Sequence, residues 1–228
     1  MIHFFIRKAI TMKKCIIAIV GLSGTGKDTL ANTLHRMEEI PPLVTYTTRP
    51  RREKEVDGKD HYFIDTASMA ELKQTPLLAY TINEKSKIEY CCPMQELDDL
   101  SRAKKCPVWR IMYRRPDEYE DYELCSYIIN PNGLLYLYWS LYKHERLNDI
   151  FIYPVFLYLP HEVQMKRLLE RGDEESVMER RYETEKDEFE WFHYSGIPNM
   201  LIDTYNDVDV RQDYYVTTFI EEFTETFA

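Results

Sequence analysis

The stretch CIIAIVGLSGTGKDT, residues 15–29, decides the fold of this chain. Its first six residues are apolar and rich in isoleucine and valine, which is typical of a strand buried inside a parallel sheet. A glycine-rich loop follows, and after it apolar residues recur at three- and four-residue steps, at Leu30, Leu34 and Met37. This spacing predicts a helix over 28–39, so the stretch is expected to form a strand, a glycine loop and a helix.

The loop, Gly21 to Thr29, fits the phosphate-binding pattern GxxxxGK. Its glycines permit backbone angles that other residues resist, so consecutive amide N–H groups can point at phosphate oxygens beside a helix N-terminus. Lys27 is expected to reach the β- and γ-phosphates. The predicted ATP contacts are Gly21, Ser23, Gly24, Thr25, Gly26, Lys27, Asp28 and Thr29.

Asp28 departs from this pattern, because the residue after the lysine is usually a serine or threonine whose hydroxyl binds Mg²⁺. A carboxylate beside a triphosphate repels it unless a cation lies between them. Asp28 and Thr29 are therefore predicted to serve Mg²⁺. The alternative is that Asp28 points away from the phosphates.

Composition narrows the possible function classes. The chain has 29 basic and 39 acidic side chains, a net charge of −10, whereas binding to a nucleic-acid backbone rests on an excess of lysine and arginine. No apolar run approaches the roughly 18 residues of a membrane-spanning helix. The five cysteines form no Cys-x-x-Cys pair, which favours reduced thiols in the cytoplasm. Neither nucleic acid nor a membrane is an expected partner.

The rest of the chain predicts an α/β fold with an insert. Short strand-like segments occupy 43–46, 61–64, 77–82 and 87–91, with helical stretches near 66–74 and 94–103. Buried strands return at 125–130, 150–159 and 200–202, alternating with helices over 131–147, 160–171, 174–194 and 208–224. Alternating strands and helices predict a parallel sheet core flanked by helices. Residues 1–12 are set aside as a leader of uncertain role, because the fold could equally begin at Met12.

Residues 47–63, TTRPRREKEVDGKDHYF, together with the glycine loop, resemble the guanylate kinases. The family pattern is matched by Thr47, Thr48, Arg49, Arg52, Glu55, Gly58, Tyr62 and Phe63. The resemblance implies that Arg49 and Arg52 hold the phosphate of a nucleoside monophosphate, and forked guanidinium groups suit that geometry. The tyrosine of the family falls on His61, and the adjacent Tyr62 is expected to take over its phosphate contact.

A second segment, KRLLERG at 166–172, resembles the lid that closes over the triphosphate donor in this family. Arg167 and Arg171 match lid arginines and lie four residues apart, hence on one helix face. Arg181, or its neighbour Arg180, matches the next one. The alternative is a charged surface helix. The resemblance implies a P-loop kinase fold with a core of 13–44 and 125–228, a lid at about 160–195 and a monophosphate-binding lobe of 45–124. The implied catalytic residues are Lys27, Arg52, Arg167, Arg171 and Arg181.

The residues that read guanine in the family are replaced in this chain. Ala79 stands at the glutamate position, Cys92 at the hydroxyl position and Asn130 at an aspartate position, while Tyr90 is kept. Alanine and cysteine satisfy the N–H donors of guanine poorly, and each buried unpaired donor costs about 1–3 kcal/mol. Either Glu84 or Glu89 could supply the missing carboxylate, or Asn130 could meet a different base. The predicted monophosphate contacts are Thr45, Arg49, Arg52, His61, Tyr62, Ala79, Tyr90, Cys92 and Asn130.

The predicted function is an ATP-dependent nucleoside monophosphate kinase that uses Mg²⁺ and transfers the γ-phosphoryl group of ATP to GMP, dGMP or a related acceptor. Two alternatives stay open: a non-catalytic protein-binding module of the same fold, and a P-loop kinase of another small phosphorylated metabolite, which Asp28 suggests. Lys27 and the three loop glycines favour the kinase. A cytoplasmic monomer or homodimer that binds small nucleotides is expected.

Overall fold

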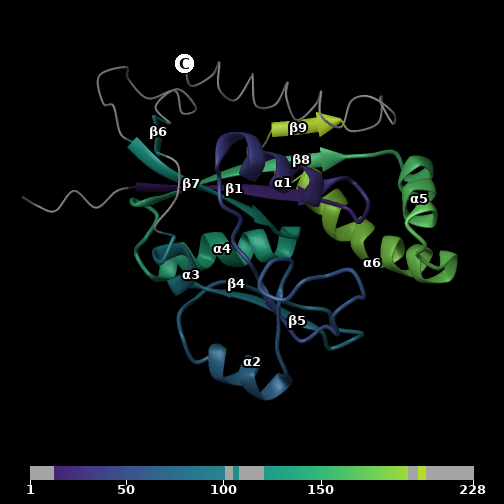
Figure 1. Ribbon diagram of the computed structural model, residues 1–228, viewed down its shortest axis with the longest axis horizontal. Helices are drawn as coiled ribbons and strands as arrows, with labels where there is room; N and C mark the ends of the chain where they lie inside the picture. Colours follow the sequence, from purple (N-terminus) through teal and green to yellow (C-terminus); the bar gives the residue numbers. More distant parts are fainter. Residues whose placement is uncertain (1–12, 101–104, 108–120, 195–199, 204–228) are drawn as a thin grey trace, which may run out of the picture.

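A five-stranded sheet forms the centre of the molecule (Figure 1). The computed structural model describes residues 13–100, 105–107, 121–194 and 200–203. The order of the strands is β6 (Lys105–Pro107), β7 (Asp121–Ile128), β1 (Lys13–Gly21), β8 (Ile150–Tyr158) and β9 (Met200–Asp203). Strands β7, β1, β8 and β9 are parallel, which confirms the predicted α/β core, whereas β6 runs antiparallel at the edge.

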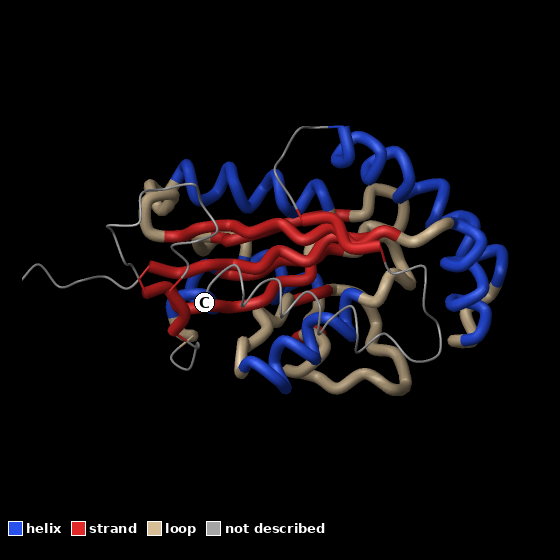
Figure 2. Tube along the Cα trace, turned by 90° about the horizontal axis from the view of Figure 1, so that it is seen from above, coloured by secondary structure: helices blue, strands red, loops and turns tan. Residues whose placement is uncertain are grey.

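The central strand β1 is buried on both faces because helices cover both sides of the sheet (Figure 2). Residues Ile16, Ala18 and Val20 share a core with α4 (Pro131–Lys143). The alternate residues Cys15, Ile17 and Ile19 share a second core with α1 (Lys27–Glu38). Side chains alternate across a strand, so a strand buried on both faces must be continuously apolar. This explains why residues 15–20 form a continuously apolar run.

The inserted lobe contains a second sheet of four short strands, in the order β3 (Tyr62–Phe63), β2 (Tyr46–Thr47), β5 (Glu89–Pro93) and β4 (Leu77–Ile82). Helix α2 (Thr66–Leu72) covers one face through Met69 and Leu72, and α3 (Met94–Asp98) follows β5. Helix α4 lies against β4, where the Ser140 hydroxyl donates to the Leu77 carbonyl. The lobe is therefore seated on the same helix that covers the core sheet.

Two predicted boundaries in this region need correction. Strand β2 begins at Tyr46 rather than at Leu43, because the Leu43 backbone N–H donates to Ser126 of the core strand β7 at 2.8 Å. Residues 105–107 and 121–124, predicted in the lobe, pair within the core sheet, and the strands of the lobe lie within 46–93. A three-residue edge strand has no alternation pattern to reveal it.

Two further helices follow β8 at the carboxyl ends of the parallel strands. They are α5 (His161–Glu170) and α6 (Glu175–Tyr194), separated by Gly172 at a φ of 92°. They confirm the helices predicted over 160–171 and 174–194, with boundaries within one residue of those expected. The helix expected at 208–224 lies outside the described residues. None of the helices in the described part of the chain is both long and apolar enough to cross a bilayer.

Candidate active site

The glycine loop lies between β1 and α1, as predicted, and its geometry requires glycine at defined points. Gly24 and Gly26 have φ angles of 83° and 94°, a region that favours glycine. A Cβ at Gly21 would lie 2.6 Å from Oγ1 of the buried Thr25 and 3.0 Å from the carbonyl oxygen of Leu157. A Cβ at Gly26 would meet nothing within 4 Å, so the loop is open where α1 begins.

Lys27 lies folded over this loop. Its Nζ donates to the carbonyl oxygens of Gly21 at 2.6 Å and Leu22 at 2.8 Å, which places the ammonium group directly at the loop. Asp28 is exposed and Thr29 half-buried in the first turn of α1. The described residues contain no group of three or more metal-binding side chains. A carboxylate and a hydroxyl beside a phosphate site nevertheless fit Mg²⁺, which usually binds nucleotide phosphates and only one or two carboxylates.

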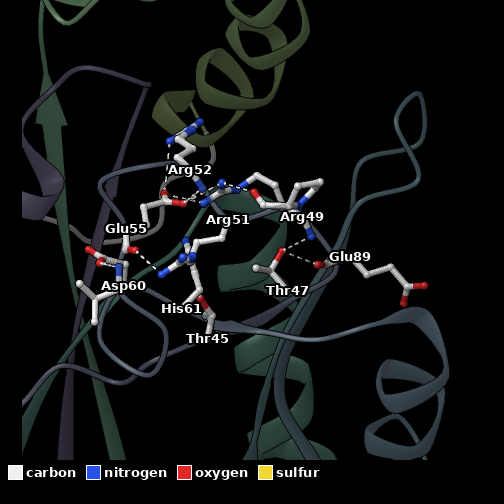
Figure 3. Close-up of polar contacts among 11 residues, drawn as sticks. Thr45, Thr47, Arg49, Arg51, Arg52, Glu55, Asp60, His61 and Glu89 are labelled. Atoms are coloured by element: carbon white, nitrogen blue, oxygen red, sulfur yellow. Dashed lines mark hydrogen bonds and ion pairs between the residues drawn. The ribbon is translucent and has the colours of Figure 1, made fainter.

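An arginine cluster in the lobe is organised by one carboxylate, Glu55 (Figure 3). The Arg49 guanidinium donates to both Glu55 oxygens, at 3.0 and 2.6 Å, and the Arg52 backbone N–H donates to the same carboxylate at 2.8 Å. Burial acts in the opposite direction, but the hydrogen bonds from Arg49 and Arg52 lower the pKa of Glu55. Arg49 has 12% of its side chain exposed and Arg52 has 52%, so Arg49 is fixed while Arg52 faces solvent.

The two threonines of the Thr-Thr-Arg segment set the position of Arg49. The Thr47 hydroxyl donates to the Glu89 carbonyl at 3.0 Å and accepts from the Arg49 backbone N–H at 3.1 Å. The Thr48 hydroxyl accepts from the Glu89 backbone N–H at 2.9 Å. Together these bonds join the start of the arginine segment to β5. The two threonines are therefore needed to hold the segment in place, beside any role in binding a ligand.

His61 lies beside the arginine cluster. Its Nδ1 is hydrogen-bonded to the Thr45 hydroxyl at 2.6 Å, and its ring lies 5.7 Å from Phe63 and 5.8 Å from Tyr90. Burial lowers the pKa of His61, and the positive charge of Arg49 lowers it further. Glu55 and Asp28 act in the opposite direction. Because Asp28 belongs to α1, the charge at the start of that helix acts on the surroundings of the arginine cluster.

Comparisons with known proteins agree with this arrangement. The chain matches the family model described as guanylate kinase over residues 12–88. It is also 27% identical over 199 residues to the guanylate kinase of Zymomonas mobilis subsp. mobilis, a match that covers 86% of this chain and 80% of that protein. The chain therefore resembles the guanylate kinases over residues 12–88 and, at lower identity, over most of its length.

Two further similarities differ in extent. The guanylate kinase of Rhodopseudomonas palustris (strain BisB5) is 54% identical over 46 residues, which cover 19% of this chain and 20% of that protein. The crystal structure of guanylate kinase from Anaplasma phagocytophilum matches with a TM-score of 0.54 at 15% identity, covering 95% of this chain and 88% of that chain. The shared fold of the guanylate kinases thus extends well beyond the segment of strong sequence similarity.

Tyr62 does not join the arginine cluster. Its ring stacks on Tyr46 at 4.5 Å, and the Tyr46 hydroxyl donates to Glu96 at 2.7 Å. Since side chains alternate along an extended strand, Tyr62 faces away from its neighbours His61 and Phe63. The expectation that Tyr62 takes over a phosphate contact therefore needs correction, because His61 is the residue placed beside Arg49.

Two of the three residues predicted to stand at guanine-reading positions are buried in the core. Ala79 and Cys92 pair across β4 and β5 and are only 2% and 0% exposed, inside the apolar core shared with α4. Burial raises the pKa of the Cys92 thiol well above its usual value. Neither side chain is placed to meet a base. Asn130 is the N-cap of α4, where its Oδ1 accepts from the Gly133 backbone N–H at 2.9 Å.

The two glutamates considered as substitutes also point elsewhere. The Glu89 carboxylate accepts from Lys73 at 2.6 Å and from the Tyr80 hydroxyl at 3.0 Å, and Figure 3 shows its side chain directed away from Arg49. Glu84 is exposed and pairs with Lys87 at 2.8 Å. A carboxylate for guanine is therefore not supplied by Glu84 or Glu89 in this conformation.

Helices α5 and α6 contact the glycine loop directly. The Gln164 amide donates to the Ser23 carbonyl at 2.7 Å, and a Cβ at Gly24 would lie 3.2 Å from Leu168. From α6, the Glu185 carboxylate accepts from the Ser23 backbone N–H and hydroxyl, both at 3.2 Å. Sequence reasoning missed Gln164 and Glu185, because they belong to no spaced motif and lie 141 and 162 residues from Ser23.

Two of the three arginines predicted for the lid lie in α5 and at its C-terminal end. Arg167 lies in α5, where burial lowers its pKa although an arginine remains charged. Arg171 caps the same helix and its guanidinium binds Asp173. The side chain of Arg181 lies outside the described residues.

A separate hollow of about 710 Å³ lies beside α3. It is lined by residues such as Tyr46, Met94 and Arg146, and none of the predicted site residues lines it.

Proposed function

We propose that the protein is an ATP-dependent nucleoside monophosphate kinase whose acceptor is GMP, dGMP or a related nucleotide. The observation that carries the proposal is that one molecule holds both a glycine loop with Lys27 folded against it and an arginine cluster fixed by the Arg49–Glu55 pair. A site of this kind presents positive charge to two phosphate groups at once. Phosphoryl transfer requires chiefly such positioning and charge stabilisation.

The reaction follows from this arrangement. An oxygen of the acceptor phosphate attacks the γ-phosphorus of ATP, and the bond from that phosphorus to the bridging β-γ oxygen breaks, which gives ADP and a nucleoside diphosphate. Arg49 holds the acceptor phosphate in a direction that Glu55 fixes. Arg52, more exposed, completes the clamp, and Lys27 stabilises negative charge on the donor phosphates.

Several finer features belong to the same proposal. Mg²⁺ carried by ATP would neutralise charge on the phosphates, and Asp28 and Thr29 are the oxygen-bearing side chains beside it. Arg167, Arg171 and Arg181 would bring further positive charge when the lid closes over the donor. His61 and Tyr90 would complete the acceptor phosphate site, and the protein would act in the cytoplasm.

The base of the acceptor is where this chain departs from its relatives. Because Ala79 and Cys92 are packed in the core, discrimination among bases cannot rest on their side chains in the described conformation. We therefore expect weaker discrimination between guanine and other bases than a carboxylate would give, since each unsatisfied donor costs about 1–3 kcal/mol. The phosphate contacts are the larger source of acceptor affinity.

The experiment is coupled ATP turnover with Mg²⁺ against ribo- and deoxyribonucleoside monophosphates of all common bases, with Lys27→Ala as the blank. Turnover with GMP or dGMP supports the proposal. Turnover only with a monophosphate of another base supports the kinase activity but assigns it a different acceptor. Absence of turnover with every acceptor contradicts the proposal and favours the non-catalytic binding module, provided that cooperative unfolding shows the protein to be folded.

A further inference from the structure

Ser23 in the phosphate loop is held by both lid helices. Its carbonyl oxygen accepts from Gln164 of α5 at 2.7 Å. Its backbone N–H and its hydroxyl both donate to the Glu185 carboxylate of α6, at 3.2 Å each. Backbone N–H groups of a glycine loop are the donors that bind phosphate oxygens. A negatively charged side chain of the protein thus uses donors of the kind that such a loop offers to phosphate.

Helix α6 is seated at this place by more than one contact. One turn after Glu185, the Glu188 carboxylate accepts from the Asn132 backbone N–H at the start of α4, at 2.8 Å. The next residue, Phe189, is buried with its ring 6.0 Å from Phe156 of β8. These contacts hold this part of α6 against the core, so the contact of Glu185 with Ser23 belongs to a larger interface between α6 and the core.

Two negatively charged groups cannot share one set of donors without strong repulsion. We propose that Glu185 is an internal competitor of the donor nucleotide, whose carboxylate binds Ser23 while the loop is empty and is displaced by the polyphosphate of ATP. The inference rests on the proposed function only in naming ATP as the displacing ligand. Arrival of the polyphosphate then releases α6 from the loop, which couples donor binding to movement of the lid.

The coupling has a direction that can be measured. Because ATP must break the Glu185–Ser23 contact, part of its binding free energy is used for displacement, and the observed affinity is lower than the loop alone would give. Removing the charge at position 185 should raise the affinity for any polyphosphate. It should not change the affinity for a ligand without phosphates, such as adenosine.

The test measures dissociation constants for ATP, inorganic tripolyphosphate and adenosine by calorimetry, without an acceptor, in the full chain. Variants are Glu185→Gln, Glu185→Ala and the control Glu190→Gln, an exposed glutamate of the same helix. We expect tighter binding of ATP and tripolyphosphate by about three- to tenfold in both Glu185 variants, larger for alanine, and a change below about twofold in the control. Cooperative unfolding in urea verifies that each variant is folded.

Equal or weaker polyphosphate binding by folded Glu185 variants would overturn the inference and make Glu185 a residue that helps to hold the donor. Equal gains in Glu185 and Glu190 variants would overturn it too, because net charge alone would then explain them. Absence of ATP and tripolyphosphate binding in every variant overturns it as well. Tighter binding without phosphoryl transfer to any acceptor would retain the inference and refute the proposed kinase activity.

Discussion

The Arg49 guanidinium and the Glu55 carboxylate are joined by two hydrogen bonds, of 3.0 and 2.6 Å, and this pair organises the arginine cluster. Paired guanidinium and carboxylate groups hold each other in a defined plane. The remaining guanidinium edge of Arg49 is thereby oriented, rather than free to rotate in solvent. The five residues between the partners, with their turn at Glu53 and Lys54, bring the two groups together.

Replacing Glu55 by glutamine should loosen Arg49 and weaken acceptor binding. We expect the KM for the acceptor to rise by about tenfold with a smaller change in kcat, and the free energy of unfolding to fall by about 1–2 kcal/mol. Steady-state kinetics and urea unfolding measure both effects. Glu53→Gln, an exposed neighbour with the same loss of charge, is the matched control. An unchanged KM in Glu55→Gln would show that Arg49 does not depend on this pair.

Gly21 and Gly26 should respond differently to the same substitution. In Gly21→Ala the new methyl group would meet Thr25 Oγ1 at 2.6 Å and a backbone carbonyl at 3.0 Å, which we expect to cost about 2–3 kcal/mol of stability. In Gly26→Ala nothing lies within 4 Å, and only the positive φ is unfavourable, at about 1 kcal/mol. Urea unfolding compares the two variants. A larger loss in Gly26→Ala would contradict the described loop geometry.

His61 gives the stability of the protein a defined pH dependence. Its pKa is lower in the folded state than in the unfolded chain, because burial and then Arg49 disfavour the charged ring. The unfolded state therefore binds more protons, and the stability that the neutral ring provides is present above the unfolded pKa of about 6.5 and is lost as pH falls toward the folded value.

We therefore expect wild type to lose more stability than His61→Gln between pH 7 and pH 5. Urea unfolding at several pH values in that window gives the comparison, because glutamine can keep a hydrogen bond to Thr45 but does not titrate. Parallel stability curves for the two proteins would contradict the buried position of His61.

Restoring the glutamate of the family at position 79 should not restore a guanine contact. Ala79 is 2% exposed and lies among apolar side chains, so Ala79→Glu would bury a carboxylate without a partner. We expect a loss of at least about 3 kcal/mol of stability, measured by urea unfolding. Thr81→Glu, half-buried two residues further along β4, provides the comparison. Full stability of Ala79→Glu would mean that this position opens to a pocket.

Local patterns predicted much of this molecule because each is encoded in adjacent residues. The apolar run before Gly21, the glycines of the loop and the stop at Gly172 each fix their own backbone, and the structure has the expected elements there. The edge strand Lys105–Pro107 escaped prediction, since its existence depends on pairing with β7 rather than on its own sequence.

The candidate site shows where local patterns stop being sufficient. His61 and Tyr62 are adjacent polar aromatic residues, and only the pairing of β3 with β2 decides that Tyr62 faces Tyr46 while His61 faces Arg49. The contact of Glu185 with Ser23 joins residues 162 positions apart, and no sequence pattern around either residue predicts it. The direction in which a side chain faces, and the distant residues that it contacts, are decided by the packing of the whole chain and not by a short segment.

The most direct test of the central claim is to incubate the protein with ATP, Mg²⁺ and GMP and to quantify both nucleotide products by chromatography, with Lys27→Ala in parallel. We predict ADP and GDP in equal amounts, and a loss of at least about 100-fold in the variant, because the role proposed for Lys27 is to stabilise charge on the transferring group. Formation of ADP without any nucleoside diphosphate, or equal rates in wild type and Lys27→Ala, would contradict it.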